Sequence, residues 1–375
     1  MTTPRLWAAA SAVLGAILVA GVVLFQRGQH AENTDAPVDW LGALANMAQD
    51  GFVRPTGTGP LDLPQDHAPH PAAQSELWQL SAHLTGPDGV PMNVQFSLMR
   101  LGLVPPDTGQ PPSIWELRSI YRAHLIVADS AQTVAQERFG RGLAGSTGFD
   151  TDAGALYFDN WALAFPGDSR TGAWRFSATS GDARVVLEMV PSKAPLSIDT
   201  ADAPFRGYAF SRLDVTGTVT LSGRDAPVTG SAWFDHAWGE LPLPGAGPVI
   251  SDRLALQLDT GHDLSIIVSQ RSDGRGVPTV DAFLIGADGA ARPLGADLAQ
   301  VTFPRQWQGA RVEWPVAWNI LLDDVLELEV APVYDAQEHD FTPPVWSGLV
   351  QAEGRLDGQP VRGTGILQLS GERTP

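Results

Sequence analysis

The chain has 375 residues, of which 43% are hydrophobic, and it contains 39 glycines and 30 prolines but no cysteine. This composition supplies enough apolar side chains for a large core, and the many glycines and prolines divide the chain into short elements, which favours two domains. The net charge of -18 argues against a nucleic-acid partner, and the lack of cysteine excludes disulfides, thiolate metal sites and a lipidated cysteine anchor.

The N-terminus carries an uncharged apolar run, residues 6–25, directly after Arg5. At about 1.5 Å per residue the run matches a bilayer core of about 30 Å. No convincing A-x-A cleavage motif follows, so we predict an uncleaved signal anchor and transmembrane helix over residues 1–27. It would leave the rest of the chain as a periplasmic ectodomain on a single-pass bacterial inner-membrane anchor. Secretion after signal cleavage is the alternative.

Residues 28–58 are expected to form a polar tether and one short amphipathic helix, which begins at Asp39 and ends at Gly51. Beyond them, apolar and polar residues alternate, as over 215–221 and 326–330, a pattern typical of half-buried antiparallel strands. Asp-Gly pairs are strong hairpin signals, and four of them lie between such segments, beginning with Asp88, Asp273, Asp288 and Asp357. The sequence therefore predicts an all-β protein with a first domain at 59–243 and a second at 244–375.

A weak internal repeat links these two domains. The matching positions are Gly217, Val219, Gly223, Pro227, Val228 and Gly230 in one copy and Gly348, Val350, Gly354, Pro360, Val361 and Gly363 in the other. Each copy is expected to form a strand, a turn and a strand, with a slightly longer turn in the second. On this alignment the first copy's Trp233, Asp235, His236 and Trp238 fall opposite Ile366, Gln368, Leu369 and Gly371. The fold itself therefore does not require the charged and aromatic residues of the first copy.

Those residues belong to the segment Trp233-Phe234-Asp235-His236-Ala237-Trp238-Gly239, which ends a predicted strand. Hydrophobic packing does not explain why a carboxylate, Asp235, and an imidazole, His236, stand at the end of a strand. In a regular strand Asp235 and His236 point to opposite faces, so their adjacency does not make them an acid–base pair. Two interpretations stay open for Asp235: a functional carboxyl group between the two indoles, or a structural carboxylate that accepts backbone or indole N–H bonds.

A second polar cluster, Asp66, His67, His70 and Glu76, lies in a proline-rich segment. The prolines keep the two histidines off a helix, so their spacing matches no established metal motif. We interpret the cluster as a loop joined by side-chain hydrogen bonds, and we expect neither a metal nor a cofactor. His124 and Asp129 are secondary candidates from another strand, more typical of hydrogen-bonding wall residues than of catalysts.

These motifs, in this order, resemble the lipocalin-like family that includes the AttH proteins and the bacterial carotenoid 1,2-hydratases (hydroxyneurosporene synthases, CrtC-like). The landmarks are residues 63–71, 76–78, 121–124 with Asp129, 138–139, 142–145, 159–161 and 233–239. The resemblance extends over residues 39–371 and implies two consecutive lipocalin-like β-barrel domains. The chain departs from the family pattern at Leu77, Gln79, Ala237 and Ser347, where the family usually has polar or aromatic side chains. The resemblance alone therefore establishes no activity.

Two functions remain as expectations. The first, which we favour, is a membrane-anchored periplasmic protein whose barrel or interdomain cleft binds an apolar, lipid- or polyene-like ligand as an accessory to an ABC transporter permease or an envelope lipid pathway. The second is a cofactor-independent hydratase, cyclase or isomerase that protonates an apolar alkene, with Asp235 as proton donor and His236 as a further catalytic candidate. The candidate ligand-binding residues are Trp233, Trp238, His67, His70, Glu76, Trp78, His124, Asp129 and Trp161.

Overall fold

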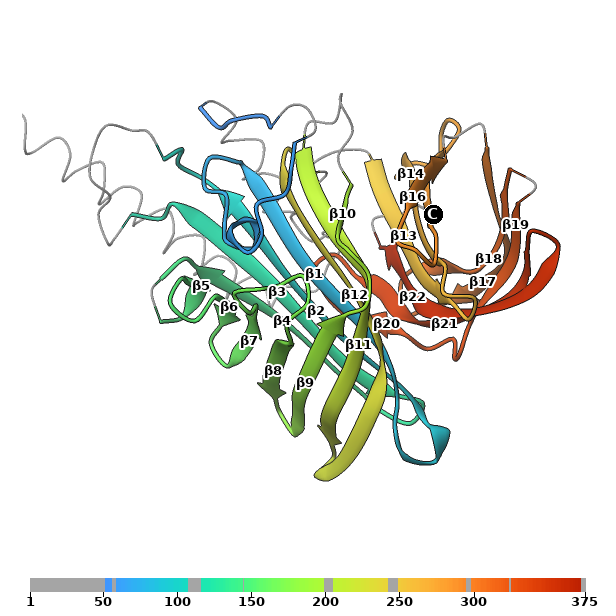
Figure 1. Cartoon of the computed structure of the whole chain (residues 1–375), viewed down its shortest axis with the longest axis horizontal. Helices are drawn as coiled ribbons and strands as arrows, with labels where there is room; N and C mark the ends of the chain where they lie inside the picture. Colours follow the sequence, from blue (N-terminus) through green and yellow to red (C-terminus); the bar gives the residue numbers. More distant parts are fainter. Residues whose placement is uncertain are drawn as a thin grey trace, which may run out of the picture. The chain divides into compact units, whose positions relative to one another are not determined.

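The computed structural model describes residues 51–55, 59–106, 116–143, 145–198, 205–241, 249–294, 298–323 and 325–371. The predicted signal anchor and the short helix before Gly51 lie outside these ranges. Within them, no helix has the length and apolar character needed to cross a membrane. The described residues all fall in one compact unit, Trp40–Pro375, and they build two antiparallel sheets that follow one another along the chain (Figure 1).

The first sheet has 12 strands and forms a nearly closed barrel. Their order is β4-β3-β2-β1-β12-β11-β9-β8-β7-β6-β5, with β10 paired to β11. The strands are β1 (Ser75–Thr85), β2 (Pro91–Gly102), β3 (Ser119–Asp129), β4 (Thr133–Arg141), β5 (Thr147–Asp150), β6 (Ala155–Phe158), β7 (Trp161–Ala164), β8 (Trp174–Ser180), β9 (Ala183–Pro191), β10 (Leu196–Ser197), β11 (Phe205–Leu221) and β12 (Arg224–Gly239). Side chains of β4 reach β7 and β8 across the barrel, because the Arg138 guanidinium lies 3.8 Å from the Trp161 ring centroid and Gln136 accepts a 2.6 Å hydrogen bond from Ser180.

The second sheet has 10 strands and forms a half-barrel. Its order is β16-β15-β14-β13-β22-β21-β19-β18-β17, with β20 paired to β21. The strands are β13 (Val249–Leu258), β14 (Asp263–Arg271), β15 (Thr279–Ile285), β16 (Ala291–Leu294), β17 (Ala299–Gln308), β18 (Glu313–Leu322), β19 (Leu326–Pro332), β20 (Glu338–His339), β21 (Val345–Leu356) and β22 (Gln359–Ser370). Two short 3₁₀ turns complete the described secondary structure, η1 (Gln65–His67) and η2 (Pro87–Gly89).

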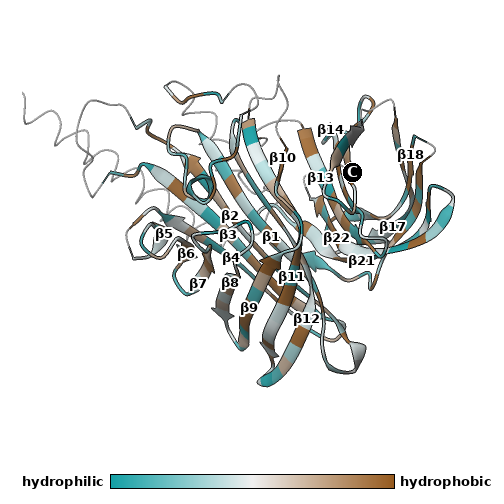
Figure 2. Ribbon diagram, viewed as in Figure 1, coloured by the Kyte–Doolittle hydropathy of each residue, from teal (hydrophilic) through white to brown (hydrophobic). Residues whose placement is uncertain are grey.

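The alternation in the sequence predicts these strands correctly. Apolar and polar bands alternate along the long strands in Figure 2, and in β19 the side chains of Leu326, Leu328 and Val330 are buried while Glu327 and Glu329 are exposed. All four Asp-Gly pairs lie between strands that pair as hairpins, so those predictions are confirmed. The limits predicted for the two domains stay predictions.

The repeat prediction is right in outline and wrong in detail. Both copies form hairpins, β11–β12 and β21–β22, but each turn has two residues, Ser222-Gly223 and Asp357-Gly358. The second turn is therefore not longer. Gly223 also does not match Gly354, because Gly223 is a turn residue with φ 71° whereas Gly354 lies inside β21, in contact with the backbone of β19.

Each sheet encloses a core of its own. The interior of the first barrel is filled by large side chains, and those of Trp78, Trp161, Trp174, Phe210 and Phe234 are fully buried there. A barrel filled in this way has little room for a ligand at its centre. A smaller apolar cluster joins the two sheets, in which Trp233 of β12 packs with Ala255 of β13 and Ile285 of β15.

Candidate functional site

The neighbouring strands β1 and β12 carry polar side chains on both of their faces. Successive strand residues point to opposite faces, so each strand contributes one set of residues to the barrel interior and another to the side of the second sheet. The inward residues are Glu76, Trp78, His236 and Trp238; the outward residues are Leu77, Gln79, Asp235 and Ala237. Asp235 and His236 thus lie on opposite faces, as the sequence predicts.

Glu76 is the centre of the inward cluster, and its side chain is 0% exposed. Its Oε2 accepts a hydrogen bond from Arg100 Nε at 2.9 Å, whereas its Oε1 lies 2.9 Å from His70 Nδ1 and 3.0 Å from His236 Nε2. Burial raises the pKa of the Glu76 carboxyl, but the hydrogen bonds from His236 and His70 and the charge of Arg100 outweigh burial and lower this pKa to about 2. Glu76 is therefore an ionised acceptor at neutral pH.

His70 is the most accessible member of the cluster, with 25% of its side chain exposed. Its ring stacks on Trp238 with centroids 3.8 Å apart, and its Nε2 lies 3.5 Å from Asp66 Oδ1. Burial lowers the pKa of His70, but hydrogen bonds to Asp66 and Glu76 outweigh that effect, so the pKa is raised.

His236 continues the hydrogen-bonded chain inward. Its ring stacks on Trp78 at 4.6 Å, and its Nδ1 lies 3.3 Å from the hydroxyl of Tyr208, which is 2.6 Å from His67 Nδ1. Burial lowers the pKa of both imidazoles, that of His67 to about 2. His67 packs against the rings of Phe165 and Trp174, and its buried Nε2 has no hydrogen-bond partner among the described residues. It therefore packs into the aromatic core instead of presenting a nitrogen to a ligand.

The outward face places Asp235 in a different setting from the one expected. Trp233 Nε1 donates a 2.8 Å hydrogen bond to Oδ1 of Asp235, and Arg253 of β13 forms an ion pair with Oδ2. The expectation that both indoles flank Asp235 is wrong, because strand alternation puts Trp238 on the other face. The indole N–H bond expected of a structural carboxylate is present, donated by Trp233. Burial raises the pKa of Asp235 against the opposing charge of Arg253.

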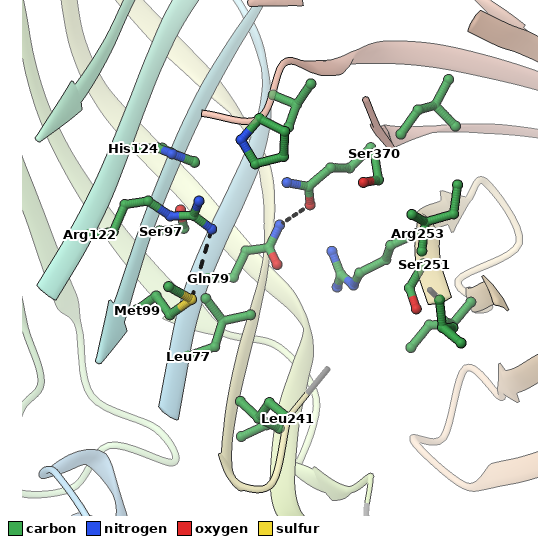
Figure 3. A pocket seen from close by; sticks show the side chains of 18 residues that line it. Leu77, Gln79, Ser97, Met99, Arg122, His124, Leu241, Ser251, Arg253 and Ser370 are labelled. Atoms are coloured by element: carbon green, nitrogen blue, oxygen red, sulfur yellow. Dashed lines mark hydrogen bonds between the residues drawn. The ribbon is translucent and has the colours of Figure 1, made fainter. Parts of the chain in front are cut away.

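Beside Asp235 the outward face borders a cleft of about 260 Å³ between the two sheets (Figure 3). Figure 3 shows Arg122 and His124 of β3 on one side and Arg253 of β13 on the other. Between them a 2.6 Å hydrogen bond from Gln79 to Gln368 joins the sheets. Most of the remaining wall is apolar, formed by Leu77, Met99, Leu241, Ile250, Ile267, Val345 and Leu369.

The other predicted residues lie apart from the inward cluster. His124 lines the cleft, its Nε2 lies 2.9 Å from Glu137 Oε1, and burial lowers the pKa of His124 to about 4. Asp129 is a turn residue whose Oδ1 accepts backbone N–H bonds from residues 131 and 132. Trp161 is a core residue, and its Nε1 donates to the carbonyl of Thr179 at 3.1 Å.

Sequence reasoning missed Arg100, Tyr208 and Arg253, which hold Glu76, His236 and Asp235 in place. Only Arg100 carried a signal, as a charged residue in the otherwise largely apolar strand β2, where a buried charge requires a partner. Nothing local in the sequence distinguishes Tyr208 or Arg253 from ordinary strand residues.

Comparisons with known proteins agree with this fold. The structure resembles the crystal structure of a provisionally assigned AttH protein from Nitrosomonas europaea, with a TM-score of 0.73 and 25% identity over 85% of this chain and 100% of that one. It also resembles kievitone hydratase from Nectria haematococca, with a TM-score of 0.62 and 15% identity over 87% of this chain and 98% of that one. No curated protein sequence gives a significant match. The family model described as AttH-like matches residues 54–372, so the chain belongs to the AttH-like family, whose fold is lipocalin-like.

Proposed function

We propose that this protein binds an apolar small molecule with an oxygen-bearing polar end in the cleft between its two sheets. The cleft itself is the observation that carries the proposal: about 260 Å³ of space with a largely apolar wall and two arginines at its sides. A dry apolar cavity of roughly 150 Å³ holds benzene, so this cleft accommodates a larger molecule than a single ring.

The polar groups of the cleft favour an acceptor on the ligand. Arg122 and Arg253 line it and are hydrogen-bond donors only, whereas the side-chain amides of Gln79 and Gln368 are both donors and acceptors and bond to each other. The Arg253 charge is balanced by Asp235, and Arg122 donates to the carbonyl of Thr342 at 2.6 Å. A ligand whose polar end is a carbonyl, hydroxyl or carboxylate oxygen therefore suits the site better than a ligand with a positively charged end. The apolar wall suits a lipid- or polyene-like body.

A membrane-tethered carrier is the cellular role that fits such a site. The apolar run at residues 6–25 supports an anchor in a bacterial inner membrane with the barrels in the periplasm. From there the protein would pass its ligand to an ABC transporter permease or an envelope lipid enzyme.

Hydration or isomerisation of the bound molecule is the second candidate. It is favoured by Asp235, because burial raises the pKa of this carboxyl and its partner Arg253 lines the cleft. Against it, both Asp235 oxygens already accept hydrogen bonds, from Trp233 and Arg253, which suits a carboxylate rather than a proton donor. Binding is therefore the function that the geometry supports better.

The test introduces a larger side chain into the cleft and measures binding of an anionic naphthalene probe, 1-anilinonaphthalene-8-sulfonate. Ala237 lines the cleft, so Ala237→Phe should weaken saturable binding at least about tenfold, or roughly 1.4 kcal/mol. The matched control is Ala135→Phe on β4, at an exposed position outside the cleft. Both variants keep the N-terminal segment and are measured in the same detergent, so probe bound to micelles cancels. Equal affinities for the two variants would refute the cleft as the binding site.

A further inference from the structure

We propose that His70, Glu76 and His236 form a binding site for one divalent transition-metal ion of the zinc type. One ligand atom from each of the three residues lies within 4.8 Å of the other two. The residues come from three places, the segment before β1, β1 itself and β12, and the fold brings them together. Two imidazoles and one carboxylate are a common ligand set of zinc centres that keep an open position.

The distances suit an ion after a small adjustment. Glu76 Oε1 lies 2.9 Å from His70 Nδ1 and 3.0 Å from His236 Nε2. Tetrahedral ligands about 2.1 Å from an ion are about 3.4 Å from one another, so each contact has to lengthen by about 0.5 Å. The His70 backbone is held by hydrogen bonds with Glu76 and Arg100, so the partly exposed His70 side chain has to supply most of this movement. Arg100 holds Oε2 at 2.9 Å, which leaves Oε1 facing both imidazoles.

The outer nitrogens of the two imidazoles already face oxygen atoms. His70 Nε2 lies 3.5 Å from Asp66 Oδ1, and His236 Nδ1 lies 3.3 Å from the Tyr208 hydroxyl. A metal-bound histidine donates its free N–H to such an oxygen, which fixes its tautomer. With an ion bound, His236 donates to Tyr208 and Tyr208 donates to His67 Nδ1 across 2.6 Å. The hydrogen-bonded chain thereby supports the ligands from the core side.

Without an ion the same three residues form a closed hydrogen-bonded cluster, in which both imidazoles donate to Glu76. The ion-free and the ion-bound protein differ in which nitrogen of each imidazole carries the proton, so the two states can be distinguished. An ion would reach the site past His70, whose side chain is 25% exposed while those of Glu76 and His236 are 0% exposed. The site lies on the inward face of β1 and β12, so the proposal is independent of ligand binding in the cleft.

The test is a Co²⁺ titration of the full-length, detergent-solubilised protein, purified without a polyhistidine tag and stripped with a chelator. We expect visible absorption typical of four- or five-coordinate Co²⁺, saturation at one ion per chain, and displacement by Zn²⁺. His236→Gln should weaken Co²⁺ binding by at least about 100-fold, the upper end of what loss of a supporting partner costs.

The matched control is His124→Gln, which removes a buried histidine paired with Glu137 at 2.9 Å in the same barrel and should leave Co²⁺ binding unchanged. If His236→Gln fails to fold, as judged by circular dichroism, His70→Gln replaces it, because His70 lies outside the strands. The proposal is overturned if the wild-type protein shows no saturable binding, or if His124→Gln weakens binding as much as the ligand variants do.

Discussion

Asp263 at the start of β14 pairs with Arg212 of β11 and with Lys193, which lies between β9 and β10, and Asp263→Asn tests this connection. Its carboxylate lies 2.7 Å from Nζ of Lys193, the only lysine in the chain, and 2.6 Å from a terminal nitrogen of Arg212. Asp263 is 0% exposed, and the side chains of Lys193 and Arg212 are 4% and 22% exposed. The substitution therefore removes the carboxylate that two largely buried cations share.

Removing one partner of a buried ion pair costs about 3–5 kcal/mol, because the remaining charge stays desolvated. With a urea m-value of about 3 kcal/mol per molar, the unfolding midpoint should fall by about 1–1.7 M. The matched control is Asp273→Asn, which breaks an exposed pair with Arg271 at 2.7 Å and should leave the unfolding midpoint nearly unchanged, because solvent screens this pair.

Urea unfolding followed by tryptophan fluorescence measures both variants under identical conditions. The reasoning is refuted if Asp263→Asn costs less than about 1 kcal/mol, the range typical of exposed pairs, or no more than Asp273→Asn. Equal costs would mean that packing, such as that of Trp233 against Ala255, joins the sheets without help from these charges.

Three further predictions concern buried ionisable side chains. Burial lowers the pKa of His124 to about 4, below its unfolded value of about 6.5, so the unfolded state binds more protons between these values and stability falls as the pH drops from 6.5 to 4. His124→Gln should reduce the slope of unfolding free energy against pH in that window by up to about 1.4 kcal/mol per pH unit, and an unchanged slope contradicts the pKa shift. Arg100→Met leaves the buried Glu76 carboxylate without its cation and should cost about 3–5 kcal/mol in urea unfolding, whereas a loss below about 1 kcal/mol would show that the histidines suffice. Asp235→Asn should lower stability by about 1–3 kcal/mol through its contacts with Trp233 and Arg253 and keep probe affinity within about threefold, while a tenfold loss of affinity would place Asp235 in the binding site itself.

The sequence predicts the strands well because their signal is local. Alternation over 326–330 and the Asp-Gly turns depend on neighbouring residues, and both appear as expected in β19 and the hairpins. The half-barrel form of the second sheet has no such local signal, since it depends on which strands pair.

The site is predicted only in part for the same reason. Period-two alternation shows that Asp235 and His236 occupy opposite faces, but it does not show which face is the interior. The partner of His236 is Glu76, 160 residues earlier in the chain, and the pair forms only because β1 lies next to β12. Arg253, which pairs with Asp235, belongs to the other sheet, and no pattern near Asp235 points to it.

The most direct test of ligand binding in the cleft is native mass spectrometry of the protein purified under mild conditions after expression. The account predicts a one-to-one adduct with an apolar molecule of the host in the wild-type protein and in Ala135→Phe, and loss of that adduct in Ala237→Phe. An adduct that survives Ala237→Phe unchanged, or a wild-type protein that carries no molecule and takes none up from a lipid extract, would contradict the central claim.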